Sequence, residues 1–434
     1  MTSVGARWHV LALPDCDSAH RIADRLIPAG DRVIRHASGR PWLVLNYPAD
    51  QIVVNESGPH RIATVGFSSA SQQLLQRSAD QVRSVDQLDD LAHQLAGNHL
   101  LLASIDGSLR AQGTATGVRR VFGATIDGCH VVADRADLLA ELGSLPMDEA
   151  TLAIRLLRQL PHPLGDLPVW RGVQPVAPDH YARINYRGQQ FHSFRWWRRP
   201  EPELSCAEGA IRLCAALDEA VRTRTQAGGV VYSDLSGGFD STPQTYFAAR
   251  GSARVLAGTA YNNDPGGGED LIWARRALSS MPGVEHSTFS TDEMPRFYGG
   301  LLELDACLDD PSDAYRAAPR MVFMMRRAIR HGAWAYLNGQ GGDELLSGHP
   351  KFEHTLFRQR PLLAVRRLRA YQLMEALSFR ETFGFLLDRR HYKRYEHPSL
   401  LELGRFSDGT GKCHERNGDE IVWFFDTWDE MCRD

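Results

Sequence analysis

The first half of the chain alternates short apolar runs with turn residues. Runs such as PWLVLNY, HRIATVGF and HLLLASIDGSLRAQG are typical of strands. The pairs Asp106-Gly107 and Asp127-Gly128 lie between such runs, and Asp-Gly supplies the positive φ that tight hairpins require. Helical patterns are predicted over residues 136–160 and over residues 84–95, where Ser84 and Gln87 have the spacing of a capping box. We therefore predict sheets covered by helices.

The second half changes pattern after a proline-rich passage, LPHPLGDLPVWRGVQPVAPDHY. Apolar strands are now followed by helices: VVYSDL by TPQTYFAAR, RVLAGTAY by EDLIWARRALSS, and WAYLNG by a helix from about Glu344. Residues 362–395 are also helical in period. This alternation is typical of a parallel sheet wound with helices. We place a domain boundary near residues 198–202, which gives domains over residues 1–198 and 199–434.

Composition narrows the class of protein. The 434 residues are 43% hydrophobic, enough to bury a core, and the formal charge of −4 argues against nucleic acid as a partner. Seven scattered cysteines without a CxxC pair indicate neither a disulfide framework nor a zinc site. No stretch predicts a signal peptide or a spanning helix, so we expect a cytoplasmic protein without a membrane partner.

The strongest chemical signal is SDLSGGFDSTP, residues 233–243, between a predicted strand and helix. Gly237 and Gly238 can adopt conformations closed to other residues, so their amides can surround an anion at the helix N-terminus. Ser236 and Ser241 offer hydroxyl donors to phosphate, and Asp240 offers a carboxylate to Mg²⁺. No Gly-Lys-Ser/Thr follows, so this is not a Walker A loop. An ordinary turn before a helix would need only one glycine.

A second strand, glycine loop and helix follow about a hundred residues later, in YLNGQGGDELLSG. In a parallel sheet both loops emerge at the carboxyl edge, so Asp343 can face Asp240 and complete a Mg²⁺ shell with phosphate oxygens. Read alone, GGDE could equally be a helix N-terminus with acidic residues favoured by the dipole. The pairing of the two loops favours the functional interpretation.

SGGFDS together with GQGGDE resembles the pyrophosphate-loop synthetase domain of the asparagine synthetase family. WRGVQPVAPDHY and RFSDGTG resemble further family segments, so the resemblance covers nearly the whole chain. It implies an α/β protein with an N-terminal αββα amidohydrolase-like (Ntn-type) sandwich and a C-terminal doubly wound parallel-sheet domain of the adenine-nucleotide α-hydrolase type. It also implies adenylation of a carboxylate by Mg·ATP, followed by amide formation. The residues that it assigns to ATP and pyrophosphate are Leu235, Ser236, Gly237, Gly238, Asp240, Ser241, Gly339, Gly341 and Gly342.

Three departures from the family pattern narrow the prediction. Thr2 stands where glutamine-dependent members carry a cysteine nucleophile, so we expect a degenerate amidotransferase domain and an amine that comes from the substrate. Gln340 replaces a common Glu or Tyr, and an amide cannot accept a proton. Leu403 replaces the family's catalytic lysine, so we assign the catalytic cation to Arg405 or Lys412.

Two sub-branches with a lost cysteine are similar to this chain: the lasso-peptide macrolactam cyclases and the β-lactam synthetases. LPHPLGDLPVWRGV and DLSGGFDST look closer to the lasso-peptide cyclases. We therefore expect a cyclase with ATP and Mg²⁺ as cofactors and a precursor peptide as substrate, with a leader-binding protein and a leader protease as further partners. The alternatives are a β-lactam-synthetase-like or asparagine-synthetase-like enzyme acting on a small amino acid, and a catalytically silent peptide-binding scaffold.

Overall fold

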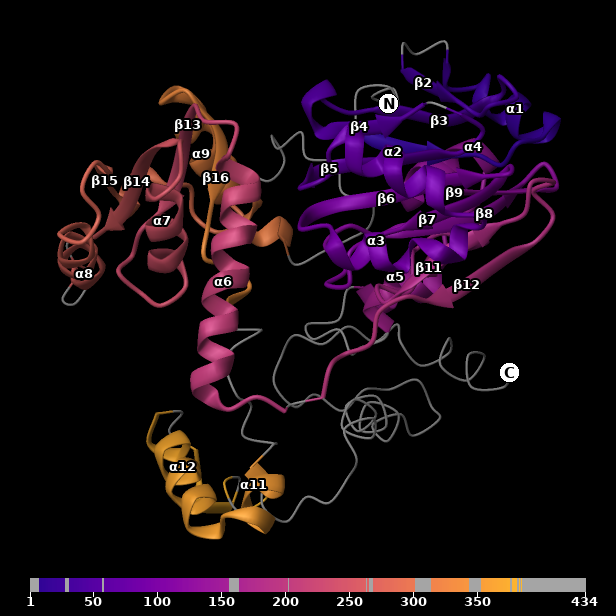
Figure 1. Ribbon diagram of the computed structural model, residues 1–434. Helices are drawn as coiled ribbons and strands as arrows, with labels where there is room; N and C mark the ends of the chain where they lie inside the picture. The colour runs from indigo at the N-terminus through magenta and orange to yellow at the C-terminus, as the bar shows by residue number, and fades with distance from the viewer. Residues whose placement is uncertain are drawn as a thin grey trace. The chain divides into compact units, whose positions relative to one another are not determined.

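The structure is a computed structural model whose helices and strands form an antiparallel and a parallel group (Figure 1). It describes residues 8–27, 31–56, 58–155, 164–201, 203–262, 264, 268–300, 314–342, 353–374, 377–380, 382 and 384. By compactness the chain divides into residues 1–158 with 163–338, and residues 159–162 with 339–434. The predicted domain boundary near residues 198–202 stays a prediction.

The antiparallel group consists of two six-stranded sheets. In order, the first contains β10 (Val173–Val176), β8 (Val121–Ile126), β9 (Cys129–Ala133), β1 (His9–Ala12), β3 (Pro41–Asn46) and β2 (Arg32–Arg35). The second contains β12 (Phe191–Arg195), β11 (His180–Ile184), β7 (Ser108–Gln112), β6 (Gly97–Ile105), β5 (Arg61–Ser68) and β4 (Ile52–Asn55). The short helical turn η3 (Ala49–Gln51) lies between β3 of the first sheet and β4 of the second, while helix α5 (Glu149–Arg155) and the turn η5 (Leu164–Asp166) lie between β9 and β10 of the first sheet.

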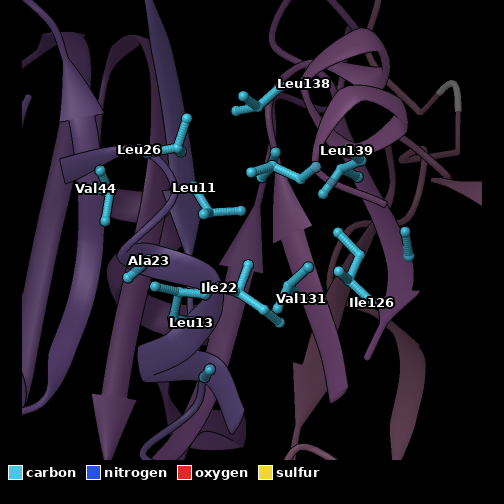
Figure 2. Close-up of a cluster of buried hydrophobic side chains, with 14 of the residues drawn as sticks. Leu11, Leu13, Ile22, Ala23, Leu26, Val44, Ile126, Val131, Leu138 and Leu139 are labelled. Carbon is cyan, nitrogen blue, oxygen red and sulfur yellow. The ribbon is translucent and has the colours of Figure 1, made fainter. Parts of the chain in front are cut away.

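Three apolar clusters show how these sheets are layered. Figure 2 shows the first, in which α1 (Asp17–Ala23) and α4 (Ala136–Gly143) pack on the first sheet. The second cluster fills the space between the sheets and contains the fully buried Trp42. In the third, α2 (Gln72–Gln81), η4 (Val85–Leu88) and α3 (Asp89–Gln94) cover the second sheet. The predicted αββα sandwich is therefore confirmed.

The predicted turns and helix boundaries are partly correct. Asp106 and Asp127 have φ of 48° and 50°, and each begins a two-residue turn of a β-hairpin, as predicted. The capping box at Ser84 does not form, because the Gln87 side chain accepts from the Arg83 amide at 2.6 Å and Ser84 makes no side-chain cap. Instead of one helix over residues 136–160, α4 ends at a left-handed Ser144 and α5 follows it.

The parallel sheet has the strand order β15-β14-β13-β16. Its strands are β13 (Val230–Asp234), β14 (Arg254–Tyr261), β15 (Glu285–Ser290) and β16 (Ala333–Leu337). Apolar contacts place α6 (Cys206–Thr225), α7 (Ser241–Ala249) and α8 (Glu269–Leu278) on one face, and α9 (Ala314–Arg330) on the other. The doubly wound parallel sheet is confirmed, while α6, α9 and β15 were not predicted.

This strand order creates a switch point between β13 and β16. From β13 the chain proceeds through α7 and α8 to β14 and β15 on one side, and then returns through α9 to β16 on the other side of β13. Ligands of such sheets bind at the carboxyl ends of the strands beside the switch point. Both predicted glycine loops begin here, after Asp234 and Leu337.

Further helices follow the parallel sheet in sequence. A short turn, η6 (Thr291–Glu293), follows β15, while α11 (Glu353–Gln359) and α12 (Pro361–Met374) lie later in the chain. Helix α12 accounts for the first part of the predicted helical period, and the predicted helix from Glu344 lies outside the described residues. Within the part of the chain that is described, no helix is long and apolar enough to cross a membrane.

Candidate functional site

The first glycine loop is fixed to the sheet before it turns into α7. The Leu235 amide donates to the carbonyl of Gly258 at 2.9 Å, and the Leu235 carbonyl accepts from Thr259 Oγ1 at 2.6 Å. Leu235 itself is 1% exposed and packs with Ala257 and Ala274. The strand thus holds the loop at its entry, so the amides of the next residues have a defined position.

Gly237 is the position in this loop that only glycine fits. Its φ is +81°, and a Cβ built on it would lie 2.3 Å from Trp273 Cβ and 2.7 Å from the Ala274 amide nitrogen on α8. Gly238 has no positive φ, and a Cβ added there would meet only Ser236 Oγ at 3.2 Å. The expectation that both glycines need special backbone conformations is therefore correct for Gly237 alone.

The two loop serines close the loop on the helix. Ser236 Oγ and Ser241 Oγ lie 2.9 Å apart, and Ser241 Oγ accepts from the Ser236 amide at 3.1 Å. The Gly238 amide in turn donates to Ser236 Oγ at 3.2 Å. Each hydroxyl therefore has a partner in the protein, and its donation to phosphate stays a prediction.

The N-terminus of α7 retains unused polar groups. Asp240 is the N-cap residue but makes no side-chain cap bond, and Thr242 Oγ1 is buried without a hydrogen-bond partner among the described residues. Pro243 lies in the first turn of the helix. The dipole of α7 favours an anion at this N-terminus. The local structure fits the phosphates of ATP.

One side chain links the first loop to Asn338 after β16 and was not identified from the sequence. Gln244 on α7 donates from Nε2 to the Asp240 carbonyl at 3.2 Å and to the Asn338 carbonyl at 2.7 Å. Asn338 directly follows β16, so this amide joins the first loop to the carboxyl end of that strand. A glutamine in a helix has no sequence signal for such a role, because its partner is 94 residues away.

The second loop is described only as far as Gly342. Gly341 has a φ of +100° with open space around its Cβ position, and the Gly342 amide points to the Gly339 carbonyl at 3.5 Å. Asp343, Arg405 and Lys412 lie outside the described residues, so the predicted metal ligand and the predicted catalytic cations remain predictions. Thr2 also lies outside them.

Magnesium stays a prediction for the same reason. The described residues contain no group of three His, Cys, Asp or Glu side chains that could hold a metal ion. Asp240 is suitably placed, because its partly buried carboxylate is beside the loop and makes no hydrogen bond to a described residue. Mg²⁺ in nucleotide sites commonly uses one or two carboxylates together with phosphate oxygens. A carboxylate beside phosphates also requires a cation to offset the repulsion between them.

A carboxylate and two phenols at the switch point form a second feature that sequence reasoning missed. Tyr336 OH on β16 donates to Asp234 Oδ2 on β13 at 2.7 Å. Burial raises the pKa of Asp234 from 3.8 to about 6, against the lowering effect of the Tyr336 hydrogen bond. Burial also raises the pKa of Tyr336 and of the neighbouring Tyr232.

The comparisons with known proteins assign the parallel-sheet half. The family model of asparagine synthase matches residues 212–418. No curated protein sequence matches the chain. Among solved structures, the glutamine PRPP amidotransferase from B. subtilis, complexed with ADP and GMP, is similar with a TM-score of 0.27 and 10% identity over 77% of this chain and 84% of that chain.

The NH3-dependent NAD synthetase from Campylobacter jejuni subsp. jejuni, in complex with nitrate, is similar with a TM-score of 0.24 and 13% identity over 50% of this chain and 100% of that chain. At these scores the assignment rests on the family match and on the loop geometry, not on the structural likenesses. That match, which includes both glycine loops, supports an ATP-dependent, amide-forming synthetase. Residues 212–418 are thus similar to the asparagine synthase family.

Proposed function

We propose that this chain is an ATP-dependent macrolactam cyclase. It adenylates an Asp or Glu side chain of a precursor peptide, and the N-terminal amine of the same peptide then forms the isopeptide bond, with release of AMP and pyrophosphate. The observation that carries the proposal is the loop from Ser236 to Ser241 at the switch point, within a stretch that matches asparagine synthase. The cofactors of the reaction are ATP and Mg²⁺.

Each part of the described loop has a role in adenylation. The substrate carboxylate attacks the α-phosphorus of ATP, the bond to the β-phosphate oxygen breaks, and pyrophosphate leaves. The amides after Leu235 and the N-terminus of α7 bind the departing pyrophosphate, and Gly237 allows the loop to lie against α8. Asp240 holds the cation that offsets the phosphate charge, and Asp343 is its proposed second ligand.

The peptide substrate is supported by sequence features rather than by the fold. Thr2 in place of a cysteine nucleophile favours an amine that belongs to the substrate over ammonia derived from glutamine. A peptide α-amine, with a pKa of about 7.7–8.0, is neutral to roughly a tenth at pH 7. The proposed partners are the precursor peptide, a leader-binding protein and a leader protease.

A mass-spectrometric assay tests the proposal. The synthetic peptide encoded by a short reading frame next to the gene is incubated with the full chain, any leader-binding protein encoded beside it, ATP and Mg²⁺. We expect the peptide to lose one water while AMP and pyrophosphate are released in equal amounts. Amide formation on a small amino acid instead would favour a β-lactam-synthetase-like enzyme. Absence of AMP with every precursor peptide would favour the silent scaffold.

A further inference from the structure

The hydrogen-bonded pair of Asp234 and Tyr336 lies where the fold predicts ligand binding. Asp234 is the last residue of β13 and Tyr336 is the penultimate residue of β16, the two strands on either side of the switch point. Tyr336 OH contacts Asp234 Oδ2 at 2.7 Å, while Asp234 Oδ1 makes no hydrogen bond to a residue that the structure describes. One carboxylate oxygen is therefore held and the other is available.

The surroundings of this carboxylate lack a positive partner among the described residues. On α9, Arg327 donates from Nε to Tyr232 OH at 3.1 Å and from an η nitrogen to Ser287 Oγ at 2.6 Å, so its guanidinium is engaged elsewhere. The His331 ring stacks on Tyr232 with centroids 6.2 Å apart. On α7, Thr245 Oγ1 donates to the main-chain carbonyl of Asp234 at 3.1 Å, not to its carboxylate.

A carboxylate in this position is costly without a ligand. Acidic groups with little contact to water are normally paired with a cation, and the half-buried Asp234 forms no ion pair with a described residue. The raised pKa of about 6 reflects the same deficit, because burial disfavours the charged form. A ligand that brings a positive or proton-donating nitrogen to Oδ1 would supply the missing partner of the carboxylate. The amine of the proposed reaction is such a group.

We propose that the Asp234 carboxylate accepts the proton of the attacking amine and that Tyr336 positions it. This inference rests on the proposed function. The neutral amine nitrogen attacks the carbonyl carbon of the acyl adenylate and forms the C–N bond. The bond from that carbon to the phosphate oxygen breaks, and AMP leaves with the electron pair. The proton that the nitrogen loses goes to Asp234 Oδ1 and from there to solvent.

The assignment answers a question that the sequence raises. Gln340 stands where the asparagine synthetase family often has a Glu or Tyr, and its amide cannot take a proton. Asp234 comes from a different strand, one residue before the segment that binds pyrophosphate. A base whose pKa lies near the working pH is also the most efficient in proton transfer. The Asp234 pKa of about 6 is closer to pH 7 than the ordinary aspartate value of 3.8.

The test separates adenylation from amide formation in the full chain. Variants Asp234→Asn and Tyr336→Phe are compared with Asp90→Asn, an exposed aspartate on α3, and with Tyr246→Phe, an exposed tyrosine on α7. Adenylation is measured as exchange of labelled pyrophosphate into ATP with the precursor peptide acetylated at its N-terminus, because that peptide cannot cyclise. Amide formation is measured by mass spectrometry with the free peptide.

We expect Asp234→Asn to keep exchange within about twofold of wild type and to lose amide formation by on the order of 10²–10⁴-fold, the usual contribution of general base catalysis. Wild-type amide formation should fall steeply below pH 6 as Asp234 and the amine both take up protons, and Asp234→Asn should show the shallower fall of the amine alone. The hydrogen bond from Tyr336 lowers the pKa of Asp234. Tyr336→Phe should therefore shift the part of the pH profile that reports Asp234 to higher pH. If Tyr336 had only a structural role, this part of the pH profile would not shift.

Three results would overturn the inference in distinguishable ways. Normal exchange with unchanged amide formation in Asp234→Asn would remove Asp234 as the base while the proposed function stands. Loss of exchange in Asp234→Asn, with folding intact by circular dichroism, would place Asp234 in adenylation instead and also contradict the inference. Absence of exchange in the wild type would contradict the proposed function, and the inference would fall with it.

Discussion

One charged side chain in each half of the molecule shows a different kind of partnership. In the antiparallel half, the fully buried Arg110 donates to the Val85 carbonyl and to Gln112, pairs with Asp89 at 2.8 Å and stacks on Tyr181. In the parallel half, Asp234 is held by a single neutral phenol, and Thr242 Oγ1 has no partner among the described residues. A satisfied buried charge supports a framework, whereas an unsatisfied polar group at a sheet's carboxyl edge indicates a place for a ligand.

The two halves also differ in the size of their buried apolar clusters. The antiparallel half has three large clusters that fill the spaces on both faces of its two sheets. The parallel sheet packs its helices through smaller clusters, and one of these includes the Leu235 that begins the glycine loop. Substitutions in the first half should therefore change stability, and substitutions at the edge of the second should change chemistry.

The largest expected effect is on stability, from Arg110→Met. Removing the guanidinium leaves Gln112 and the Val85 carbonyl without their partner inside the protein. We expect the free energy of unfolding to fall by about 3–5 kcal/mol, because each buried group left without a hydrogen-bond partner costs about 1–3 kcal/mol. Chemical denaturation measures this, with the exposed Arg171→Met as control, for which we expect a change within about 0.5 kcal/mol. If Arg110→Met left the free energy of unfolding unchanged, the proposed difference between the two halves would be wrong.

The next effect is a dependence of stability on pH that comes from Asp234. Its pKa is raised in the folded state from 3.8 to about 6, so the folded protein binds the proton more tightly than the unfolded chain. Protonated Asp234 therefore stabilises the folded protein below pH 4, and this stabilisation is lost as the pH rises to 6. The free energy of unfolding should fall by on the order of 3 kcal/mol over this range.

Asp234→Asn removes this titration. The variant should therefore gain stability relative to wild type between pH 4 and pH 7, as measured by denaturation at several pH values. A difference between the two proteins that stays constant across this range would mean that Asp234 is not desolvated in the folded state. The comparison cancels the contributions of all other titrating groups.

Gly237→Ala should impair chemistry more than folding. Its Cβ would require Trp273 and the backbone of α8 to shift, and φ of +81° is strained for alanine. We expect AMP formation to fall by about 10²-fold, the cost of misplacing catalytic groups by about 1 Å. Gly238→Ala, whose Cβ meets only Ser236 Oγ, should lose much less. Equal effects of the two substitutions would contradict the role given to the Gly237 conformation.

The smallest expected effect is that of Thr2→Ala. The antiparallel half is proposed to be a framework without glutaminase chemistry, so neither the wild type nor the variant should release glutamate from glutamine. Glutamate assays with and without ATP test this. Release by the wild type that Thr2→Ala abolishes would assign a catalytic role to the antiparallel half and would contradict the comparison between the halves.

Local signals in the sequence predicted local structure well. The Asp-Gly pairs gave the two hairpins, and the strand, glycine loop and helix around Gly237 are as predicted. Strand β15 was missed because its sequence, EHSTFS, is mostly polar. The Ser84 capping box failed because the Gln87 side chain accepts from the Arg83 amide instead of the Ser84 amide.

The missed parts of the candidate site depend on contacts between distant residues. Asp234 and Tyr336 are 102 residues apart, and Gln244 reaches Asn338 over 94 residues. These residues are neighbours because β16 lies beside β13 in the parallel sheet. No local sequence pattern predicts this strand order. Sequence reasoning could identify the loop but not the carboxylate next to it.

A crystal structure of the protein with Mg²⁺ and a non-hydrolysable ATP analogue tests the central claim most directly. The account predicts the phosphates against the amides of Gly237 and Gly238 at the N-terminus of α7, with Mg²⁺ bound to Asp240 and Asp343. Nucleotide density at any other edge of the parallel sheet, or in the antiparallel half, would contradict it.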